Sequence, residues 1–299
     1  MSLQLPPKLA IHLEVTHPDK MIWPAAGITK EKYLSYLVRI APYMLPFLKN
    51  RPLTTIRYPH GVAGPHFFQK NCPDHAPDFI QTAAIGDNRF ILCEDLPTLF
   101  WLGNQLAMEF HLPFNRADAK NPLEIVIDLD PPDRRHFSQA VDAAQILHDI
   151  FTRLEINSFP KLSGSRGLQI HLPLIDQQLS FEETRLFTAF LAHLLVQQHP
   201  KAFTIERLKK NRGDRLYIDY LQHAAGKTII CPYSPRAKAE ATIAAPLSWD
   251  EVTKDLRLEK FTLNTVLERI DQGRDPWKNY FKTKNQSLVK VITALKKQE

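Results

Sequence analysis

The chain has 299 residues, of which 44% are hydrophobic and 23% are charged, and its net charge is +6. These values exclude a disordered chain and predict either one large domain or two closely packed lobes. The three cysteines form no CxxC pair, so neither a disulfide framework nor a zinc knuckle is expected. The first 15 residues do not resemble a signal peptide, and no apolar run is long enough to span a bilayer, so we expect a cytoplasmic protein.

Positive charge is concentrated in residues 201–240, which hold nine Lys or Arg against four Asp or Glu. A basic stretch of this kind attracts polyanions such as nucleic acid or nucleoside triphosphates. The alternative is a solvated basic surface with no ligand.

The first half of the chain predicts two helices and a strand. Thr29 is positioned to cap a helix that runs towards Asn50, and we expect Pro42 to kink this helix or end its first half. Residues 51–59 are typical of a strand, and residues 95–110 have the apolar spacing of a buried helix.

The second half alternates between strands and helices. Helices are expected over 137–155, which has one apolar face, and after Ser180, which forms a capping box with Glu183. Helices are also expected to fill the remainder to Glu299. Strands are expected at 123–130, 158–162, 168–174, 215–221 and 227–234. This order predicts a mixed α+β fold with a β-α-β-β-like unit.

Three aspartates are candidate metal ligands. Asp128 and Asp130 flank one leucine on a strand, so their carboxylates leave the same face. Asp219 lies on another apolar strand, and if the two strands are adjacent, three carboxylates converge where divalent cations could bind. The alternatives are that the first two acids cap a turn, and that Asp219 forms a salt bridge with Arg212 or Arg215.

A short turn, SGSRG (163–167), is a candidate phosphate-binding loop. Its small residues allow backbone N–H groups to approach a phosphate, and Arg166 adds a cation. The alternative is an ordinary polar turn. The next strand places Gln169 and His171 on one face, where His171 is equally consistent with a structural role. Farther along the chain, Lys227 and Arg236 could bind phosphate oxygens.

Several segments in this order resemble the primase-polymerase module of bacterial ligase D, of the archaeo-eukaryotic primase superfamily. The strongest are IDLDPP, LSGSRGLQIHLPL and IDYLQHAAGKTIICPYSPRAK, and HPDKMIWPAAGITK, RPLTTIRYPHG, FFQKNCP and APLSWDEV extend the likeness over nearly the whole chain. The resemblance implies a primase-like fold with an RRM-like catalytic unit. It divides the chain into an N-terminal lobe at 1–115, which binds DNA and its 5′-phosphate, and a catalytic lobe at 116–299. No ligase or phosphoesterase region is present, so we expect a stand-alone module or a fragment of a larger protein.

The resemblance also implies site residues. It makes Asp128, Asp130 and Asp219 the ligands of two divalent cations, Mn²⁺ or Mg²⁺. It assigns Lys20 and Lys30 to a DNA 5′-phosphate, and Phe67 and Phe68 to stacking on the template. Without the resemblance, this phenylalanine pair is more typical of a core. The incoming nucleotide would contact Ser163, Ser165, Arg166, His111, Arg212, Gln222, Lys227 and Arg236.

The chain departs from the family pattern at three positions. Gln169 stands where the second motif usually has histidine, and Arg166 replaces the usual lysine of that turn. His223 follows Gln222 where the family often has asparagine. An arginine preserves affinity for phosphate, whereas the loss of the histidine leaves its role open.

The resulting hypothesis is a polymerase that adds nucleotides, with ribonucleotides preferred, to primer 3′ ends at gaps and double-strand breaks in bacterial non-homologous end joining. We expect it to associate with the nucleoid, with DNA gaps, nicks or broken ends and nucleoside triphosphates as partners, alongside Ku and a DNA ligase. One alternative is gap filling in excision repair or primer synthesis. Another is a catalytically silent module that binds DNA ends.

Overall fold

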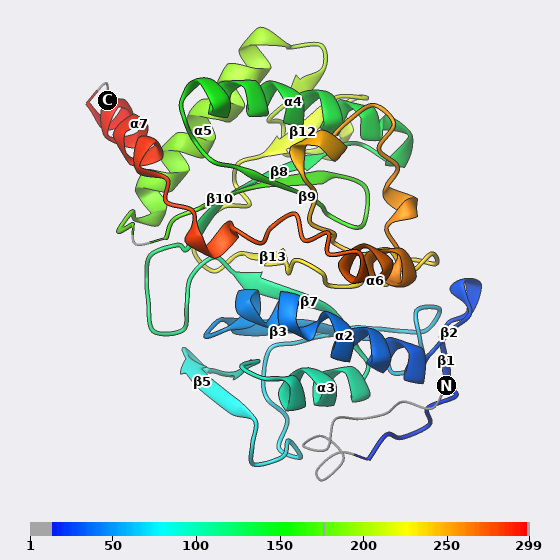
Figure 1. Ribbon diagram of the computed structural model, residues 1–299. Helices are drawn as coiled ribbons and strands as arrows, with labels where there is room; N and C mark the ends of the chain where they lie inside the picture. The colour runs from blue at the N-terminus through cyan, green and yellow to red at the C-terminus, as the bar shows by residue number, and fades with distance from the viewer. Residues whose placement is uncertain (1–13, 176, 298–299) are drawn as a thin grey trace. The chain divides into compact units, whose positions relative to one another are not determined.

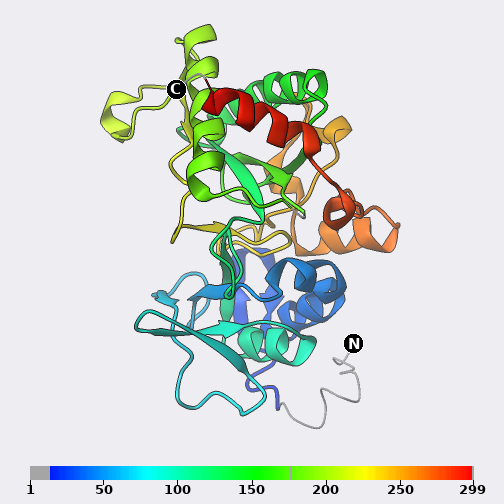
Figure 2. The ribbon, with the colours of Figure 1, turned by 90° about the vertical axis from the view of Figure 1, so that its left-hand side faces the viewer.

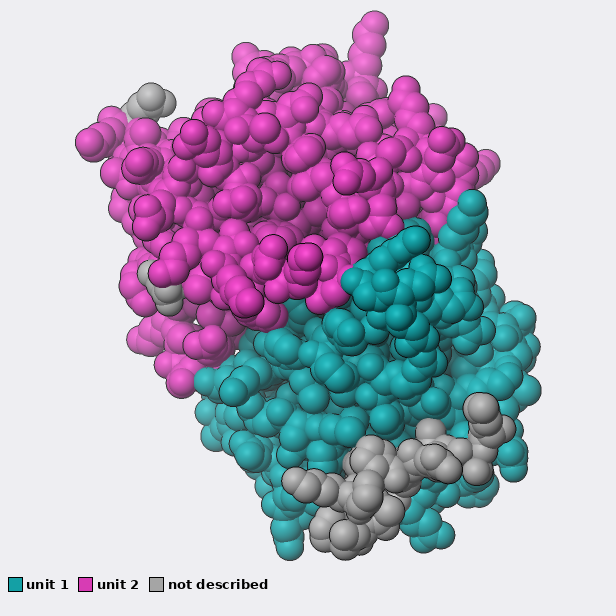
Figure 3. Space-filling model, in the orientation of Figure 1, with its two compact units in different colours: residues 1–112, 230–244, 259–274 teal, residues 113–229, 245–258, 275–299 magenta. Residues whose placement is uncertain are grey.

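The computed structural model describes residues 14–175 and 177–297, which form two compact units (Figure 3). Unit 1 comprises Met1–Leu112, Ile230–Ala244 and Glu259–Arg274, and unit 2 comprises Pro113–Ile229, Ala245–Leu258 and Asp275–Glu299. Two segments within the expected catalytic lobe at 116–299, residues 230–244 and 259–274, belong to unit 1. Most of the segment examined for a signal peptide lies outside the described residues.

Most of a six-stranded sheet with the order β13-β7-β3-β6-β5, in which β4 also pairs with β3, lies in unit 1 (Figure 1). A separate two-stranded sheet joins β1 and β2. The strands are β1 (Met21–Trp23), β2 (Ile28–Thr29), β3 (Pro52–Arg57), β4 (Phe67–Gln69), β5 (Gln81–Ile85), β6 (Asn88–Leu92), β7 (Ala107–Pro113) and β13 (Thr228–Ile230).

Helix α2 (Lys30–Leu48) begins as the sequence predicts, with the Thr29 side chain accepting a hydrogen bond from the Lys32 amide. The expectation that Pro42 ends its first half is wrong, since the helix continues through Pro42 and Pro46. Its face on both sides of Pro42, from Leu37 to Met44, is buried, and this packing outweighs the backbone hydrogen bond that a proline removes. Helix α6 (Leu263–Asp271) packs against α2.

The helix expected over 95–110 is only half correct. Asp95 caps α3 (Leu96–Asn104), and the chain then turns at Leu106, which has a φ of 59°, into strand β7. Strand β7 pairs with β3 and is buried on both faces. A run that is apolar throughout does not distinguish a buried strand from a buried helix by its spacing.

Unit 2 contains a five-stranded sheet with the order β11-β12-β8-β10-β9. Helices α4 (Phe137–Arg153) and α5 (Phe181–Gln198) pack against this sheet, and α7 (Gln286–Lys296) packs against α5 (Figures 1 and 2). The β8-α4-β9-β10 order confirms the predicted β-α-β-β-like unit. The strands are β8 (Glu124–Asp130), β9 (Phe159–Leu162), β10 (Leu168–Pro173), β11 (Phe203–Thr204) and β12 (Leu216–Asp219).

The predicted mixed α+β fold is confirmed, as is the capping box of Ser180 and Glu183 at the start of α5. The expectation that helices fill the rest of the chain is only partly correct. Between β13 and α6 the chain is mostly turns and irregular backbone, with isolated bridges such as Pro235 to Ile243, and its helical segments are short 3₁₀ turns. Within 14–175 and 177–297, no helix combines the length and the apolar character needed to cross a membrane.

Candidate active site

Strand register brings the three aspartates together in unit 2. Strands β12 and β8 are antiparallel neighbours in which Asp219 lies opposite Asp128 and Tyr217 lies opposite Asp130. Residues directly opposite one another on paired strands project from the same face. Asp130, two residues beyond Asp128, also shares this face, so the structure places all three carboxylates on one side of the sheet.

The crowding of these acids is visible in their pKa values. Burial, together with the nearby charge of Asp130, raises the pKa of Asp128 to about 7, although a hydrogen bond from Gln169 opposes the shift. Burial also raises the pKa of Asp219, against hydrogen bonds from the Tyr217 hydroxyl and the Gln222 amide. Such a group of carboxylates is more stable with positive charge beside it.

Arginine supplies positive charge at Asp130. The Arg166 guanidinium donates two hydrogen bonds to its carboxylate, at 2.6 and 2.7 Å, and Arg212 Nη1 lies 3.7 Å from it. Among the described residues, no three His, Cys, Asp or Glu side chains are grouped so that they could hold a metal ion. The three carboxylates share one face of the sheet, but in this structure Asp130 is paired with Arg166 and the three are not arranged around a common point.

The predicted phosphate loop is a tight turn organised by its first serine. The Ser163 hydroxyl accepts hydrogen bonds from the backbone amides of Ser165, Arg166 and Gly167, at 3.0–3.3 Å. A Cβ atom at Gly167 would lie 2.1 Å from the Leu129 carbonyl oxygen, so only glycine allows this approach to β8. The Ser163 hydroxyl thus occupies the place that an anion takes where backbone amides converge.

Four of the predicted residues line one pocket in unit 2. The pocket has a volume of about 350 Å³ and is lined by Arg185, Arg207, Arg212, Tyr217, Asp219, Leu221, Gln222, Ala224 and Lys227. A second pocket of about 210 Å³ also includes Arg212, here with Asp130 and Arg166. Cations thus outnumber acids beside the aspartates, as a triphosphate requires.

Three polar or charged residues that line this pocket, Arg185, Arg207 and Tyr217, were not among the predicted site residues. Tyr217 donates a hydrogen bond to Asp219 at 3.1 Å, and the Arg212 guanidinium lies 3.6 Å from the centroid of the Tyr217 ring. Tyr217 stands two residues before Asp219, so both side chains leave one face of β12, and this spacing could have indicated that Tyr217 lines the pocket. Arg185 lies on α5, far along the chain from the other lining residues, so its position in the sequence did not indicate that it lines the pocket.

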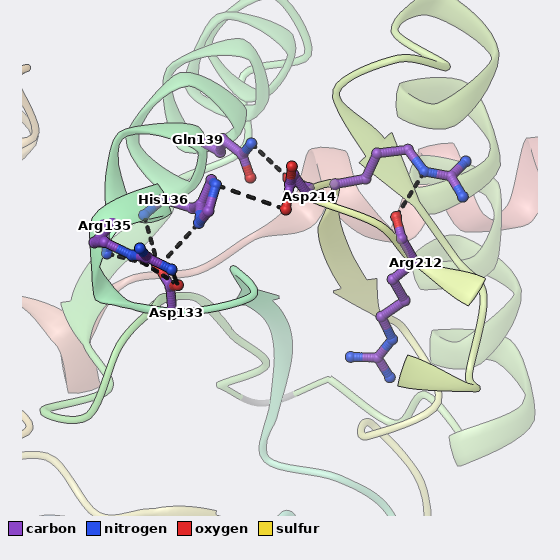
Figure 4. A network of polar contacts seen from close by, with 7 residues as sticks. Asp133, Arg135, His136, Gln139, Arg212 and Asp214 are labelled. Carbon is purple, nitrogen blue, oxygen red and sulfur yellow. Dashed lines mark hydrogen bonds and ion pairs between the residues drawn. The ribbon is translucent and has the colours of Figure 1, made fainter. Parts of the chain in front are cut away.

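The loop that carries Arg212 is held by the start of α4 (Figure 4). The Gln139 side chain donates a hydrogen bond to the Asp214 carbonyl at 2.7 Å, and His136 Nε2 lies 4.0 Å from the Asp214 carboxylate. His136 is itself bonded to Asp133 at 2.9 Å. Arg212 in turn donates to the carbonyl of Glu206 at 2.8 Å. These contacts fix the backbone around Arg212.

Two predicted nucleotide contacts lie in unit 1 and share one carboxylate. His111 Nε2 lies 3.1 Å from Glu109, and Arg236 Nε lies 3.3 Å from its other oxygen. Burial would raise the pKa of Glu109, but the His111 hydrogen bond and the Arg236 charge outweigh it and lower the pKa to about 2. Glu109 therefore holds both side chains as an anion.

The two predicted 5′-phosphate lysines interact electrostatically in unit 1. Lys30 is 3% exposed, and its Nζ donates to the Thr16 carbonyl and hydroxyl at 2.7 and 2.9 Å. Lys20 Nζ donates to the Pro59 carbonyl at 2.6 Å. Burial, and then the charge of Lys20, lower the pKa of Lys30 to about 8.

The aromatic pair is on the surface of unit 1. Phe67 and Phe68 on β4 are 45% and 65% exposed, and the Arg57 guanidinium lies 5.4 Å from the Phe67 ring centroid. A core role for either ring is therefore wrong. Exposed rings are available for stacking on bases.

Comparison with known proteins agrees with the resemblance. The family described as LigD, primase-polymerase domain, matches residues 29–277. The chain belongs to this family. It is 48% identical to the bifunctional non-homologous end joining protein LigD of Bacillus subtilis, covering 95% of this chain and 47% of that protein. It is 33% identical to the multifunctional LigD of Mycolicibacterium smegmatis, covering 88% and 35% of the two chains.

A solved LigD structure also matches the fold. The polymerase domain of Mycobacterium tuberculosis ligase D, in complex with DNA, has a TM-score of 0.84 and 29% identity, covering 91% of this chain and 99% of that one. The chain spans about half or less of the curated LigD proteins that it matches.

The structure locates the residues at which this chain departs from the LigD pattern. Gln169 on β10 lies opposite Asp128 and donates a hydrogen bond to it at 3.0 Å. His171 does not contact the aspartates, because it lies farther along β10 and is buried with its Nδ1 2.7 Å from Glu124. His223 is buried and bonded to Thr184. Gln169 and Arg166 therefore each touch a candidate catalytic carboxylate, whereas His223 does not.

Proposed function

We propose that this chain is a template-dependent nucleotidyltransferase that extends primer 3′ ends at DNA gaps and broken ends. The observation that carries the proposal is the shared face of Asp128, Asp130 and Asp219 beside a pocket lined by arginine and lysine. Membership of the LigD primase-polymerase family supports the same reaction.

The three carboxylates would hold two divalent cations, Mn²⁺ or Mg²⁺. Their oxygen-only donors fit such hard cations, and the raised pKa of Asp128 reflects carboxylate crowding that a cation would relieve. When bound, the cations stabilise charge on the attacking and leaving oxygens. Arg166, which neutralises Asp130 in the present structure, would then be available to a phosphate oxygen.

In the reaction, the primer 3′-hydroxyl attacks the α-phosphate of a nucleoside triphosphate. The new O–P bond forms as the bond to the bridging oxygen of the β-phosphate breaks, pyrophosphate leaves, and the hydroxyl proton passes to solvent. Arg212 and Lys227 bind the triphosphate, together with Ser163, Ser165 and Arg166 of the SGSRG turn. Gln222, whose side chain is bonded to the Thr228 carbonyl at 2.6 Å, borders the sugar.

The remaining assignments concern the DNA. Lys20 and Lys30 would bind the 5′-phosphate on the far side of a gap, and Phe67 and Phe68 would stack on the template. The biological setting would be end joining, with ribonucleotides preferred and a Ku-like protein and a ligase as partners. The names of the LigD relatives support this setting.

Primer extension on gapped DNA tests the proposal. Asp128→Ala and Asp130→Ala are each expected to lower incorporation by at least about 100-fold, because each removes charge needed in the transition state. Asp142→Asn, on the exposed side of α4, is the matched control and should keep full activity. Undiminished extension by either alanine variant would exclude the assigned site.

The dependence of extension on the 5′-phosphate of the gap distinguishes end joining from the alternatives. The assay compares gaps with and without a 5′-phosphate, and ribonucleotides with deoxyribonucleotides. A preference for the phosphorylated gap that Lys20→Ala removes would support the proposed setting. Extension that ignores the phosphate would favour general gap filling.

A further inference from the structure

A buried lysine lies behind the aspartate site. Lys161 on β9 is 0% exposed, and its Nζ donates a hydrogen bond of 2.6 Å to Oε1 of Gln169 and a longer one, at 3.4 Å, to the Leu162 carbonyl. A buried ammonium group is expensive unless it is hydrogen-bonded, and an apolar side chain would fill the same space at lower cost. Its presence therefore calls for a role beyond packing.

The lysine is in line with the candidate catalytic acids. Lys161 lies opposite Gln169, Gln169 lies opposite Asp128, and Asp128 lies opposite Asp219. The four residues form one cross-strand row over β9, β10, β8 and β12. Directly opposed side chains on one face are in contact distance, so each member can orient the next.

The donors and acceptors of this row determine how the Gln169 amide is oriented. A lysine ammonium can only donate, so the Gln169 amide must turn its oxygen towards Lys161. Its NH₂ group then faces Asp128, to which it donates at 3.0 Å. Without the lysine, the amide oxygen loses this donor, and the NH₂ group is held less firmly towards Asp128.

We propose that Lys161 is a positioning residue that, acting through Gln169, holds the Asp128 carboxylate in the orientation needed for metal binding and catalysis. This inference rests on the proposed function. It also accounts for glutamine at a position where the family usually has histidine. A neutral imidazole offers one acceptor and one donor, which is the pattern that the amide presents to Lys161 and Asp128.

The test measures Mn²⁺ binding directly, by electron paramagnetic resonance of free Mn²⁺, alongside primer extension. Loss of a group that supports a metal ligand typically lowers metal affinity 10- to 100-fold. We expect Lys161→Met and Gln169→Leu each to weaken Mn²⁺ binding by about tenfold and to lower kcat, with the KM for nucleotide unchanged. Ile170→Val, a buried change on the other face of β10, is the matched control and should alter neither quantity.

A double-mutant cycle distinguishes positioning from loss of structure. If Lys161 acts through Gln169, the Lys161→Met/Gln169→Leu variant should bind Mn²⁺ no more weakly than Gln169→Leu alone. The double variant replaces both polar groups with apolar ones, so it also provides the test if a single variant does not fold. Gln169→His should keep Mn²⁺ affinity within about threefold of wild type, because it keeps the donor and acceptor pattern.

The outcomes distinguish a failure of the proposed Lys161 role from a failure of the proposed metal site. In one outcome, Asp128→Asn abolishes Mn²⁺ binding, whereas Lys161→Met and the double variant bind Mn²⁺ as wild type does. This outcome would overturn the role of Lys161 and leave the metal site standing. Wild-type Mn²⁺ binding that Asp128→Asn does not affect would overturn the proposed metal site and, with it, the inference. Additive losses in the cycle would show that Lys161 does not act through Gln169, and would also overturn it.

Discussion

The lowered pKa of Lys30 predicts that recognition of a DNA 5′-phosphate depends on pH. Burial and the neighbouring Lys20 lower this pKa to about 8, and only the protonated lysine attracts a phosphate. Binding therefore takes up a proton, and affinity falls as pH rises through this value. The phosphate itself has a second pKa of about 6, so its charge is nearly constant above neutral pH.

The size of the effect follows from the titration of one group. With a pKa of about 8, Lys30 is about nine-tenths protonated at pH 7 and about one-tenth protonated at pH 9. If the bound phosphate requires the ammonium form, the advantage of a phosphorylated over an unphosphorylated gap should fall about tenfold between these pH values. Fluorescence anisotropy with the two DNAs, which differ only in the phosphate, isolates this contribution.

Two variants complete the test. Lys30→Met should lose both the phosphate advantage and its pH dependence. Lys32→Met, which removes an exposed lysine of the same helix, should behave like wild type. An advantage that is constant from pH 7 to 9, or one that retains its pH dependence in Lys30→Met, would show that the ammonium form of Lys30 does not bind the 5′-phosphate.

Other predictions concern the turn, the pocket and the surface rings. Gly167→Ala should displace the SGSRG turn, because the new Cβ would lie 2.1 Å from a carbonyl oxygen of β8, and calorimetry should show a lower Tm with a raised nucleotide KM. Arg212→Lys should raise the nucleotide KM about tenfold in steady-state assays, with Tm nearly unchanged. An ammonium group cannot stack on the Tyr217 ring as the guanidinium does. Phe67→Ala and Phe68→Ala should each weaken template binding by about 1–3 kcal/mol in anisotropy titrations. Their thermal stability should stay the same, since both rings are exposed.

Much of unit 2 could be predicted from local sequence. Strand β8 is an apolar run that ends in acids and two prolines, and its alternation correctly placed Asp128 and Asp130 on one face. The Ser180 capping box correctly marked the start of α5. These features depend on neighbours within a few residues, so the sequence contains the information that determines them.

The partners of the charged side chains could not be predicted in the same way. Sequence analysis offered Arg212 or Arg215 as an ion-pair partner for Asp219, whereas Asp219 accepts its hydrogen bonds from Tyr217 and the Gln222 amide. Arg166, which was expected to bind a phosphate, pairs with Asp130 in this structure, and that pairing was not predicted. Such pairings depend on strand register and on loop anchoring, which bring together residues that are distant along the chain.

The phenylalanine pair shows where the family resemblance added information that patterning lacked. Two consecutive phenylalanines in a short strand are typical of a core, because large apolar side chains are usually buried. Strand β4 pairs with β3, and its two phenylalanine rings are 45% and 65% exposed, although they project from opposite faces of the strand. Exposing two such rings costs solvation free energy with no gain in packing, so their retention at the surface is best explained by a ligand with flat apolar faces, as nucleic-acid bases have.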